Sequence, residues 1–304
     1  MVTVSPDMKQ VFELVTRVAR TDASVLIRGE TGTGKELVAR ALHDLSARAR
    51  APFRAVNCAT LTPELLASEL FGHVRGAFTG AVAERKGLFA LADGGSLLLD
   101  EVAEIDLDLQ ARLLRVLQDK TFIPVGGTTP IQVDIRILAA THKALRREVE
   151  AGRFRGDLMY RIRVVPLFIP PLRERVGDAE ALSWHFIDEF NRQGLREVTA
   201  IADPALEAML AHNWPGNVRE LRNVVEYAFA VGQGPVLTLD QLPPELRGEP
   251  PPGERATPDP RELERRRLAE ALERTGGRKG EAAKLLGISR STLWRRMREH
   301  RLGT

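Results

Sequence analysis

The chain has a single cysteine, and this scarcity excludes several classes of protein. Cys58 stands alone among 304 residues, so a disulfide framework and a cysteine zinc site are impossible within one chain. No stretch approaches the roughly 18 consecutive apolar residues of a membrane-spanning helix. Residues Met1–Gln10 lack the charged start and apolar core of a secretory signal. We therefore expect a cytoplasmic protein without a membrane partner.

Most of the chain also lacks an excess of either charge. Residues 261–304 carry 13 Lys and Arg against 6 Asp and Glu, whereas the other residues carry 31 against 35. A basic excess at one end indicates a nucleic-acid contact there, although a solvated charged helix would give the same count. Hydrophobic residues make up 43% and charged residues 28% of the chain. This balance is typical of globular proteins and excludes a wholly disordered chain.

Short apolar runs alternate with helical patterns in the first half of the chain. The strand-like runs are Ser24–Ile27, Phe53–Cys58, Ser96–Leu99 and Ile135–Ala140, and the helical patterns are Lys35–Leu45 and Gln110–Leu117. This alternation predicts an α/β fold with a mostly parallel sheet covered on both faces.

From Asp178 to about Leu246 the pattern becomes all-helical and predicts a small lid subdomain. The candidate helices are Ala179–Arg192, Pro204–His212 and Asn217–Val231. The segment Gly248–Pro260 contains five Pro and two Gly, so it predicts a semi-extended linker.

A glycine-rich turn lies between the first predicted strand and the first predicted helix. It reads GETGTGKE over residues 29–36 and fits G-x-x-x-x-G-K. Such a turn aims backbone N–H groups at phosphate oxygens, the helix start adds partial positive charge, and Lys35 reaches the β- and γ-phosphates. The context predicts ATP binding by Gly29, Glu30, Thr31, Gly32, Thr33, Gly34, Lys35 and Glu36. Glu36 stands where Ser or Thr would bind magnesium, so Thr33, water or Glu36 itself would have to help place the metal.

Two carboxylates follow the apolar run at 96–99. Asp100 would hold Mg²⁺, directly or through water, and Glu101 would polarise the attacking water. Together with the phosphate loop they predict an ATPase, and nothing in the sequence suggests the acceptor site of a kinase.

The segment Gly76–Ala81, GAFTGA, lies between the phosphate loop and these carboxylates. Its composition alone favours a tight turn with Phe78 buried, against an exposed flexible loop that presents Phe78 and Thr79. Together with Glu69–Gly72, however, GAFTGA resembles the signature of the sigma-54-dependent transcriptional activators. These are bacterial enhancer-binding proteins of the NtrC type in the AAA+ ATPase superfamily, and the resemblance runs from about Val4 to Leu302.

The resemblance implies the fold, the domains and the partners. The expected domains are an AAA+ α/β core at 1–176, a helical lid at 177–247, a linker at 248–260 and a Fis-type helix-turn-helix domain at 261–304. The expected partners are ATP, Mg²⁺, sigma-54 with its RNA polymerase holoenzyme, double-stranded enhancer DNA and further copies of the chain, from a dimer to a hexameric ring. The sigma-54 contact is assigned to Gly76, Ala77, Phe78, Thr79, Gly80 and Ala81.

The resemblance also assigns residues around the nucleotide. Asn57 matches an asparagine that holds the catalytic glutamate, and Thr141 matches a sensor of the γ-phosphate. His142 belongs to the same sensor segment but stands where many relatives have Asn, so the resemblance leaves its precise role open. Arg155 and Arg161 match arginine fingers that reach a neighbouring subunit's nucleotide, although one of them could instead form a structural ion pair. Arg219 matches a second sensor in the lid.

The last forty residues contain a helix, a glycine-containing turn and a basic helix. The predicted helices are Glu262–Arg274, Lys279–Leu286 and Arg290–His300, with Ser289 as an N-cap. This order is typical of a helix-turn-helix, whose second helix enters the DNA major groove, although a three-helix bundle used only for dimerisation has the same outline. The expected DNA contacts are Ser289, Arg290, Ser291, Thr292, Arg295, Arg296 and Arg298. We expect Leu293, Trp294 and Met297 to pack in the core, although Trp294 could stack instead.

The sequence therefore predicts an activator that binds enhancer DNA and uses ATP hydrolysis to open the closed promoter complex of sigma-54 polymerase. Two alternatives remain: a DNA-binding regulator whose ATPase core does not hydrolyse, and an AAA+ remodeller of another substrate.

Overall fold

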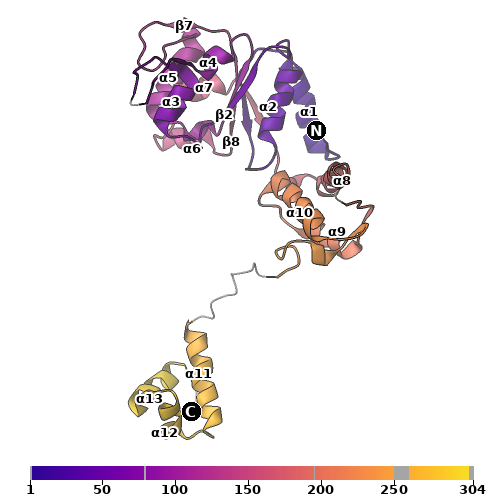
Figure 1. Ribbon diagram of the computed structural model, residues 1–304, viewed down its shortest axis with the longest axis vertical. Coiled ribbons are helices and arrows are strands. Elements are labelled where there is room, and N and C mark those ends of the chain that lie inside the picture. The colour runs from indigo at the N-terminus through magenta and orange to yellow at the C-terminus, as the bar shows by residue number, and fades with distance from the viewer. Residues whose placement is uncertain (1, 79, 195, 250–259, 301–304) are drawn as a thin grey trace. The chain divides into compact units, whose positions relative to one another are not determined.

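The computed structural model describes residues 2–78, 80–194, 196–249 and 260–300 (Figure 1). The chain divides into two compact units, Met1–Pro243 and Pro244–Thr304, which are described separately. Within the described ranges, no helix is long and apolar enough to cross a membrane. Most of the expected linker, residues 250–259, lies outside the described residues.

Five parallel strands form the central sheet of the first unit, in the order β2-β5-β8-β1-β9. Their bounds are β1 Val25–Arg28, β2 Phe53–Asn57, β5 Ser96–Asp100, β8 Arg136–Thr141 and β9 Val165–Phe168. The predicted parallel sheet is confirmed, and the four predicted strands lie within one residue of β1, β2, β5 and β8. β9 was not predicted.

Alternate residues of the inner strands β1, β5 and β8 enter two separate cores, one on each face of the sheet. In β5, Leu98 belongs to the core that contains α1 and α2, whereas Leu97 and Leu99 belong to the core that contains α3, α4, α5 and α7. Figure 1 shows these two groups of helices on opposite sides of the sheet. The helices are α1 Pro6–Ala19, α2 Lys35–Asp44, α3 Pro63–Phe71, α4 Leu88–Leu91, α5 Leu107–Asp119, α6 Leu145–Glu150 and α7 Gly156–Ile162.

Two short antiparallel hairpins and a 3-10 turn complete the α/β core. β3 Gly72–His73 pairs with β4 Arg85–Lys86, β6 Thr121–Phe122 pairs with β7 Ile131–Gln132, and the turn is η1 Val102–Glu104. The loop that carries GAFTGA connects β3 and β4, so the first hairpin fixes both ends of that loop.

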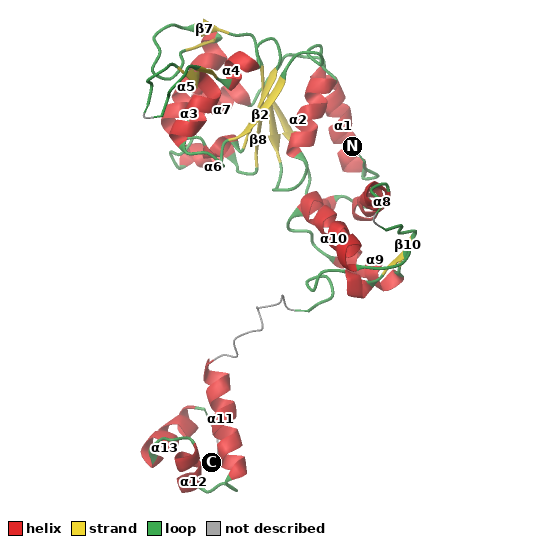
Figure 2. Cartoon of the chain, viewed as in Figure 1, coloured by secondary structure: helices red, strands yellow, loops and turns green. Residues whose placement is uncertain are grey.

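The lid contains the three predicted helices and a small pair of strands (Figure 2). Its elements are η2 Leu172–Glu174, α8 Asp178–Asn191, β10 Ala200–Ile201, α9 Asp203–Ala211, α10 Asn217–Val231, β11 Val236–Leu237 and η3 Leu239–Gln241. The expectation of an all-helical lid is therefore wrong in one detail, because β10 and β11 pair in parallel. Each strand has only two residues, too few for a period-2 pattern to show in the sequence.

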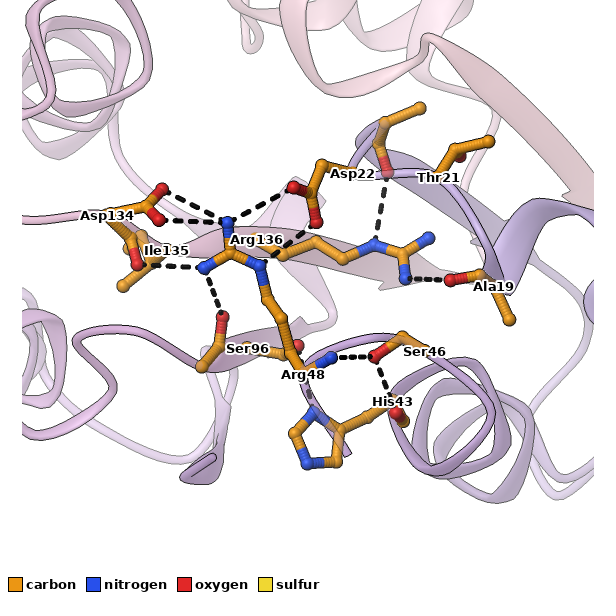
Figure 3. Close-up of polar contacts among 12 residues, drawn as sticks. Ala19, Thr21, Asp22, His43, Ser46, Arg48, Ser96, Asp134, Ile135 and Arg136 are labelled. Carbon is orange, nitrogen blue, oxygen red and sulfur yellow. Dashed lines mark hydrogen bonds and ion pairs between the residues drawn. The ribbon is translucent and has the colours of Figure 1, made fainter. Parts of the chain in front are cut away.

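A buried arginine, Arg136, lies at the amino end of the sheet, and Figure 3 shows its hydrogen bond to the Ala19 carbonyl. Arg136 is 1% exposed and donates hydrogen bonds to carbonyls of Val18, Ala19 and Leu42, at the carboxyl ends of α1 and α2. Burial lowers the pKa of this guanidinium. The partial negative charge of the two helix ends favours a cation there, so Arg136 anchors both helices to the strand.

A second arginine, Arg48, lies across the same end of the sheet (Figure 3). It pairs with Asp22 at 3.0 Å and with Asp134 at 3.0 Å, and thereby connects the loop after α1 with the loop before β8. Its hydrogen bonds and ion pairs with both carboxylates outweigh its desolvation, and its pKa is raised.

The second unit is a three-helix bundle of α11 Pro260–Arg274, α12 Lys279–Leu285 and α13 Arg290–Glu299. Its core contains Leu268, Ala271, Ala282, Ala283, Leu293 and Met297. The predicted N-cap is confirmed, because the Ser289 hydroxyl accepts a hydrogen bond from the Thr292 N–H at 3.1 Å. The turn before it contains Gly287 at a φ of 65°, a backbone conformation that favours glycine.

Candidate functional site

The phosphate loop connects the end of β1 to the start of α2, as predicted. Gly32 and Gly34 have φ values of 81° and 96°, in the left-handed region that residues with a side chain rarely adopt. The Thr33 hydroxyl donates to the Glu30 carbonyl at 2.8 Å and stabilises the turn from within. Because α2 begins at Lys35, its free N–H groups and partial positive charge face the loop.

Lys35 is 7% exposed and is held by acceptors at the mouth of the loop. Its ammonium donates to the carbonyls of Gly29 at 3.1 Å and Glu30 at 3.3 Å, and pairs with Glu101 Oε1 at 3.3 Å. The predicted phosphate-binding lysine and the predicted catalytic carboxylate therefore lie in direct contact, although 66 positions separate them in sequence.

Asp100 ends β5 beside Asn57, its register partner at the end of β2. The Asn57 amide donates to Asp100 Oδ2 at 3.3 Å, and the Glu101 N–H donates to Asp100 Oδ1 at 3.0 Å. Burial, followed by the charge of Glu101, raises the pKa of Asp100. The resemblance predicts that the Asn57 side chain holds the Glu101 carboxylate. The structure instead places this amide on Asp100, because the sheet register aligns residues 57 and 100.

Glu101 is held by His142, a residue of the sensor segment whose precise role the sequence left open. Nδ1 of His142 lies 2.7 Å from Glu101 Oε2, and the His142 N–H donates to the same oxygen at 3.2 Å. Burial would raise the pKa of Glu101, but the hydrogen bond from His142 and the charge of Lys35 outweigh it, so the pKa is lowered. The carboxylate is thus kept ionised, as a residue that polarises water must be.

Thr141, the neighbouring candidate for a γ-phosphate sensor, is buried and bonded to backbone groups of its own chain. It is fully buried at the end of β8, and its hydroxyl accepts a hydrogen bond from the Lys143 N–H at 3.0 Å. Its carbonyl accepts one from the Gly29 N–H at 3.3 Å, so β8 also positions the first residue of the phosphate loop.

The residues at the end of β5 fit a magnesium ion that is mostly held by phosphate and water. Within the described ranges there is no group of three His, Cys, Asp or Glu side chains that could hold a metal. Magnesium in ATPases typically takes one or two carboxylates plus substrate phosphates. Asp100 can offer one carboxylate, and Lys35 lies where it could hold the phosphates. Glu36 is exposed on the first turn of α2, and Thr33 is 4% exposed.

The lid is attached to the phosphate loop by a network centred on Glu30. The Glu30 carboxylate accepts two hydrogen bonds from Arg173, at 2.6 and 2.9 Å, and one from Asn217 at 3.2 Å. These hydrogen bonds lower the pKa of Glu30 to about 2. Glu30, predicted to bind nucleotide, therefore has its carboxylate committed to the lid.

The start of α10 also contacts the loop through the backbone. Gly32 lies so close to the lid that a Cβ there would be 2.1 Å from the Gly216 carbonyl oxygen. The Arg219 N–H lies 3.3 Å from the Gly32 carbonyl oxygen, and the Arg219 side chain is exposed above the loop. The predicted second sensor is thus beside the phosphate loop.

The two predicted arginine fingers lie elsewhere on the unit. Arg155 forms a two-pronged ion pair with Asp157, at 2.7 and 3.1 Å, and Arg161 donates to the Leu117 carbonyl at 3.1 Å. Both side chains are exposed, so each guanidinium is accessible from outside its own chain.

The GAFTGA loop is closed at its base and exposes its aromatic residue. The Gly76 N–H donates to the Ala81 carbonyl at 2.9 Å, and Ala81 is buried. Phe78 is 43% exposed, with its ring edge-on to His73 at 5.1 Å between centroids. The prediction from composition alone, a buried Phe78, is therefore wrong. Thr79 lies outside the described residues.

The last helix of the second unit presents a basic surface. Arg290, Ser291, Arg295 and Arg298 are exposed, whereas Arg296 pairs with Glu264 of α11. One prediction is wrong: Leu293 and Met297 enter the core at 1% and 5% exposure, but Trp294 is 61% exposed. Its position on α13 lies about 100° around the helix from Leu293, outside the buried stripe.

A parallel sheet with a phosphate loop, paired carboxylates at its carboxyl end and a helical lid defines an AAA+ P-loop ATPase. Comparison with known families gives three consecutive matches: the sigma-54 interaction domain over residues 1–168, the AAA+ ATPase lid domain over 173–259, and the bacterial regulatory protein, Fis family, over 260–300. The chain belongs to the family of sigma-54-dependent transcriptional activators.

Individual relatives support this assignment along the whole chain. The regulatory protein AtoC of Escherichia coli is 46% identical over 99% of this chain and 67% of its own length. The DNA-binding transcriptional regulator NtrC of Salmonella typhimurium is 43% identical over 98% of this chain and 70% of its own. NtrX from Brucella abortus, solved in complex with ATP, has a TM-score of 0.75 at 36% identity, over 99% of this chain and 69% of its own. The chain thus spans about two thirds of the length of these relatives.

Proposed function

We propose that this chain hydrolyses ATP in a ring of its own copies and uses the energy to convert the closed complex of sigma-54 RNA polymerase into an open one. The observation that carries the proposal is the contact between Lys35, Glu101 and His142 at the carboxyl end of the sheet. It brings a phosphate-binding cation, an ionised carboxylate and a third residue that holds the carboxylate into one place.

ATP would compete with Glu101 for Lys35. When the β- and γ-phosphates enter the loop, Lys35 exchanges the Glu101 carboxylate for phosphate oxygens, because these carry more negative charge. Glu101 then retains its hydrogen bond to His142 and is free to accept a proton from water at the γ-phosphate. Asp100 would hold Mg²⁺, which supplies neutralisation of the phosphate charge when it is bound.

The arginine fingers give a reason for assembly. Arg155 and Arg161 are exposed and lie away from the phosphate loop of their own chain. A guanidinium that stabilises phosphoryl transfer must touch the γ-phosphate. We therefore assign these two residues to the nucleotide of a neighbouring copy, which makes hydrolysis dependent on a ring.

The GAFTGA loop is assigned to sigma-54. Its base is fixed by the β3–β4 hairpin, and Phe78 is exposed at its tip. A loop held at both ends can be raised or lowered as a unit when the γ-phosphate is gained or lost. The second unit would hold enhancer DNA through its basic last helix, with Arg290, Arg295 and Arg298 as contacts.

A native-gel assay with purified sigma-54 tests this function. The protein is compared without nucleotide, with ADP, and with ADP plus a metal fluoride that mimics the γ-phosphate. We expect a complex only with the mimic. Thr79→Ala should abolish that complex and retain ATP hydrolysis, whereas Val82→Ala, at an 80% exposed site just beyond the loop, should retain both.

Two results would contradict the proposal in different ways. Protein that hydrolyses ATP but forms no complex with sigma-54 under any condition acts on another substrate. Protein that neither hydrolyses ATP nor responds to the mimic, while still binding a DNA site, is a DNA-binding regulator with an inactive ATPase core.

A further inference from the structure

The exposed indole of Trp294 has no explanation in the folding of the second unit. The core of this unit is filled by α11, α12 and the Leu293 and Met297 side chains of α13, and Trp294 is not among its members. At 61% exposure it leaves most of a large apolar surface in water. A singly exposed apolar side chain is common on protein surfaces, so the role of Trp294 has to be inferred from the groups that surround it.

Trp294 lies in the middle of the basic face of α13. Arg290 and Arg298 stand one turn before and one turn after it, and positions four apart form a row along a helix. All three side chains are exposed, and Ser291 and Arg295 form a second exposed row beside them. The second row continues to the exposed Glu299 at the end of α13. Three exposed arginines against this one carboxylate leave the face basic, so it attracts a polyanion and repels another cationic surface.

The indole is also oriented from the neighbouring helix. Nζ of Lys279, at the start of α12, lies 5.8 Å from the centroid of the Trp294 ring. A cation over the face of an indole favours one ring orientation, although the interaction is weak at an exposed site. One ring face is therefore covered by a lysine that can itself contact phosphate, and the rest of the ring is turned outward.

We propose that Trp294 reads a thymine in duplex DNA by apolar contact with its C5-methyl group. The inference rests on the proposed DNA binding by α13 and adds the base class that the helix recognises. In the major groove the thymine methyl is the apolar group by which a protein distinguishes T from C, and apolar side chains recognise it by contact. Stacking on an unpaired base would require an opened strand. Pairing with a second copy would bring two rows of arginine together.

The experiment compares thymine with deoxyuridine, which differs only by that methyl group. The full chain is first used to select binding sites from random duplexes, and each dT of the selected site is then replaced by dU. We expect wild-type protein to bind about fourfold more weakly at one position in each half-site, the value of one buried methyl group. Trp294→Ala should bind the two duplexes equally.

Three variants distinguish the contact between Trp294 and the thymine methyl group from packing within the unit and from phosphate contacts. Leu285→Ala removes a 55% exposed apolar side chain from α12 of the same unit and should keep the wild-type ratio between dT and dU. Trp294→Phe should retain part of the ratio. Arg298→Ala should reduce the slope of log affinity against log salt by about 1, whereas Trp294→Ala should leave that slope unchanged.

The outcomes distinguish this inference from the proposed function. Specific DNA binding with no dU-sensitive position, or with the same sensitivity in wild type and Trp294→Ala, overturns the thymine contact and leaves DNA binding intact. Failure to select any site overturns both. Unchanged far-UV circular dichroism of Trp294→Ala would show that the lost contact, and not unfolding, causes its effect.

Discussion

The two ends of the central sheet both hold charged side chains, but their partners differ in kind. At the amino end, Arg136 and Arg48 are held by backbone carbonyls and by the carboxylates of Asp22 and Asp134. At the carboxyl end, Glu101 pairs with both Lys35 and His142, and Lys35 also donates to two carbonyls of the phosphate loop. A nucleotide has nothing to displace at the first end, whereas at the second its phosphates can replace Glu101 as the partner of Lys35. Partners that no ligand replaces stabilise the fold at the amino end. Partners that a ligand can replace allow Lys35 to bind phosphate at the carboxyl end.

The largest expected effect is on the amino end. Arg136→Met would leave buried carbonyls of α1 and α2 without a donor, and each such group costs about 1–3 kcal/mol. We expect the free energy of unfolding to fall by about 4 kcal/mol in denaturant titrations, with unchanged ATP affinity of the folded protein. Arg54→Met, at an exposed site in β2, is the control. If the Arg136→Met protein is as stable as the wild type, the Arg136 guanidinium is not needed for stability.

The opposite pattern is expected at the carboxyl end. Lys35→Ala removes the cation that ATP phosphates require and should reduce ATP turnover about 100-fold or more, with ATP binding lost. The melting temperature should change little, because His142 still holds Glu101. Isothermal titration with ATP measures the loss, and Arg40→Ala, one turn further along α2, is the control. Normal affinity in Lys35→Ala would refute the nucleotide site.

A smaller effect should appear at the contact between loop and lid. The pKa of Glu30 is about 2, below its usual 4.5, because of its hydrogen bonds to Arg173 and Asn217. A lowered pKa stabilises the folded state above the usual value, and this stabilisation is lost as pH falls from 4.5 toward 2. Glu30→Gln should therefore lower the melting temperature by about 2 °C at pH 7.

The sign of this pH dependence is the test. The difference in melting temperature between wild type and Glu30→Gln should shrink below about pH 4.5, as measured by thermal scans in a series of buffers. A difference that is constant down to pH 3 would mean that the charge of Glu30 does not hold the lid.

The last prediction concerns Cys58, a reporter of the carboxyl end, and expects no change in stability or turnover. Burial, together with the charges of Asp100 and Glu101, raises the pKa of Cys58 to about 12. Since only the thiolate reacts, this thiol should react with a disulfide reagent at pH 8 on the order of 1000-fold more slowly than the unfolded chain. Rapid reaction in the folded protein would show that the strand ends open readily.

Much of the nucleotide site could be predicted because its motifs are local. The phosphate loop and the pair Asp100–Glu101 each occupy one short segment, and apolar runs before them fix their place at the ends of strands. Contacts between strands are harder. That Glu101 meets His142 follows from β5 and β8 being neighbours, and that Asn57 meets Asp100 follows from the register of β2 on β5. Neither strand order nor register is encoded within one segment.

The basic helix shows a second limit of the sequence. An apolar residue type predicts burial only when its angle around the helix is also known. Leu293 and Met297 define the buried stripe of α13, and Trp294 lies beside the arginine row instead. Sequence motifs thus miss contacts between residues that are distant in the chain, such as Glu101 and His142. They also misplace an apolar residue such as Trp294 that lies outside the core.

The close approach of Gly32 to the Gly216 carbonyl has a consequence for chimeras within the family. Any side chain at position 32 would collide with the lid, and the Glu30 carboxylate has its partners in Arg173 and Asn217. A lid transplanted from a relative will therefore seat on this core only if the donor preserves that small set of contacts. In a chimera, the lid and the phosphate loop should therefore come from the same parent protein, even though about 140 residues of chain lie between them.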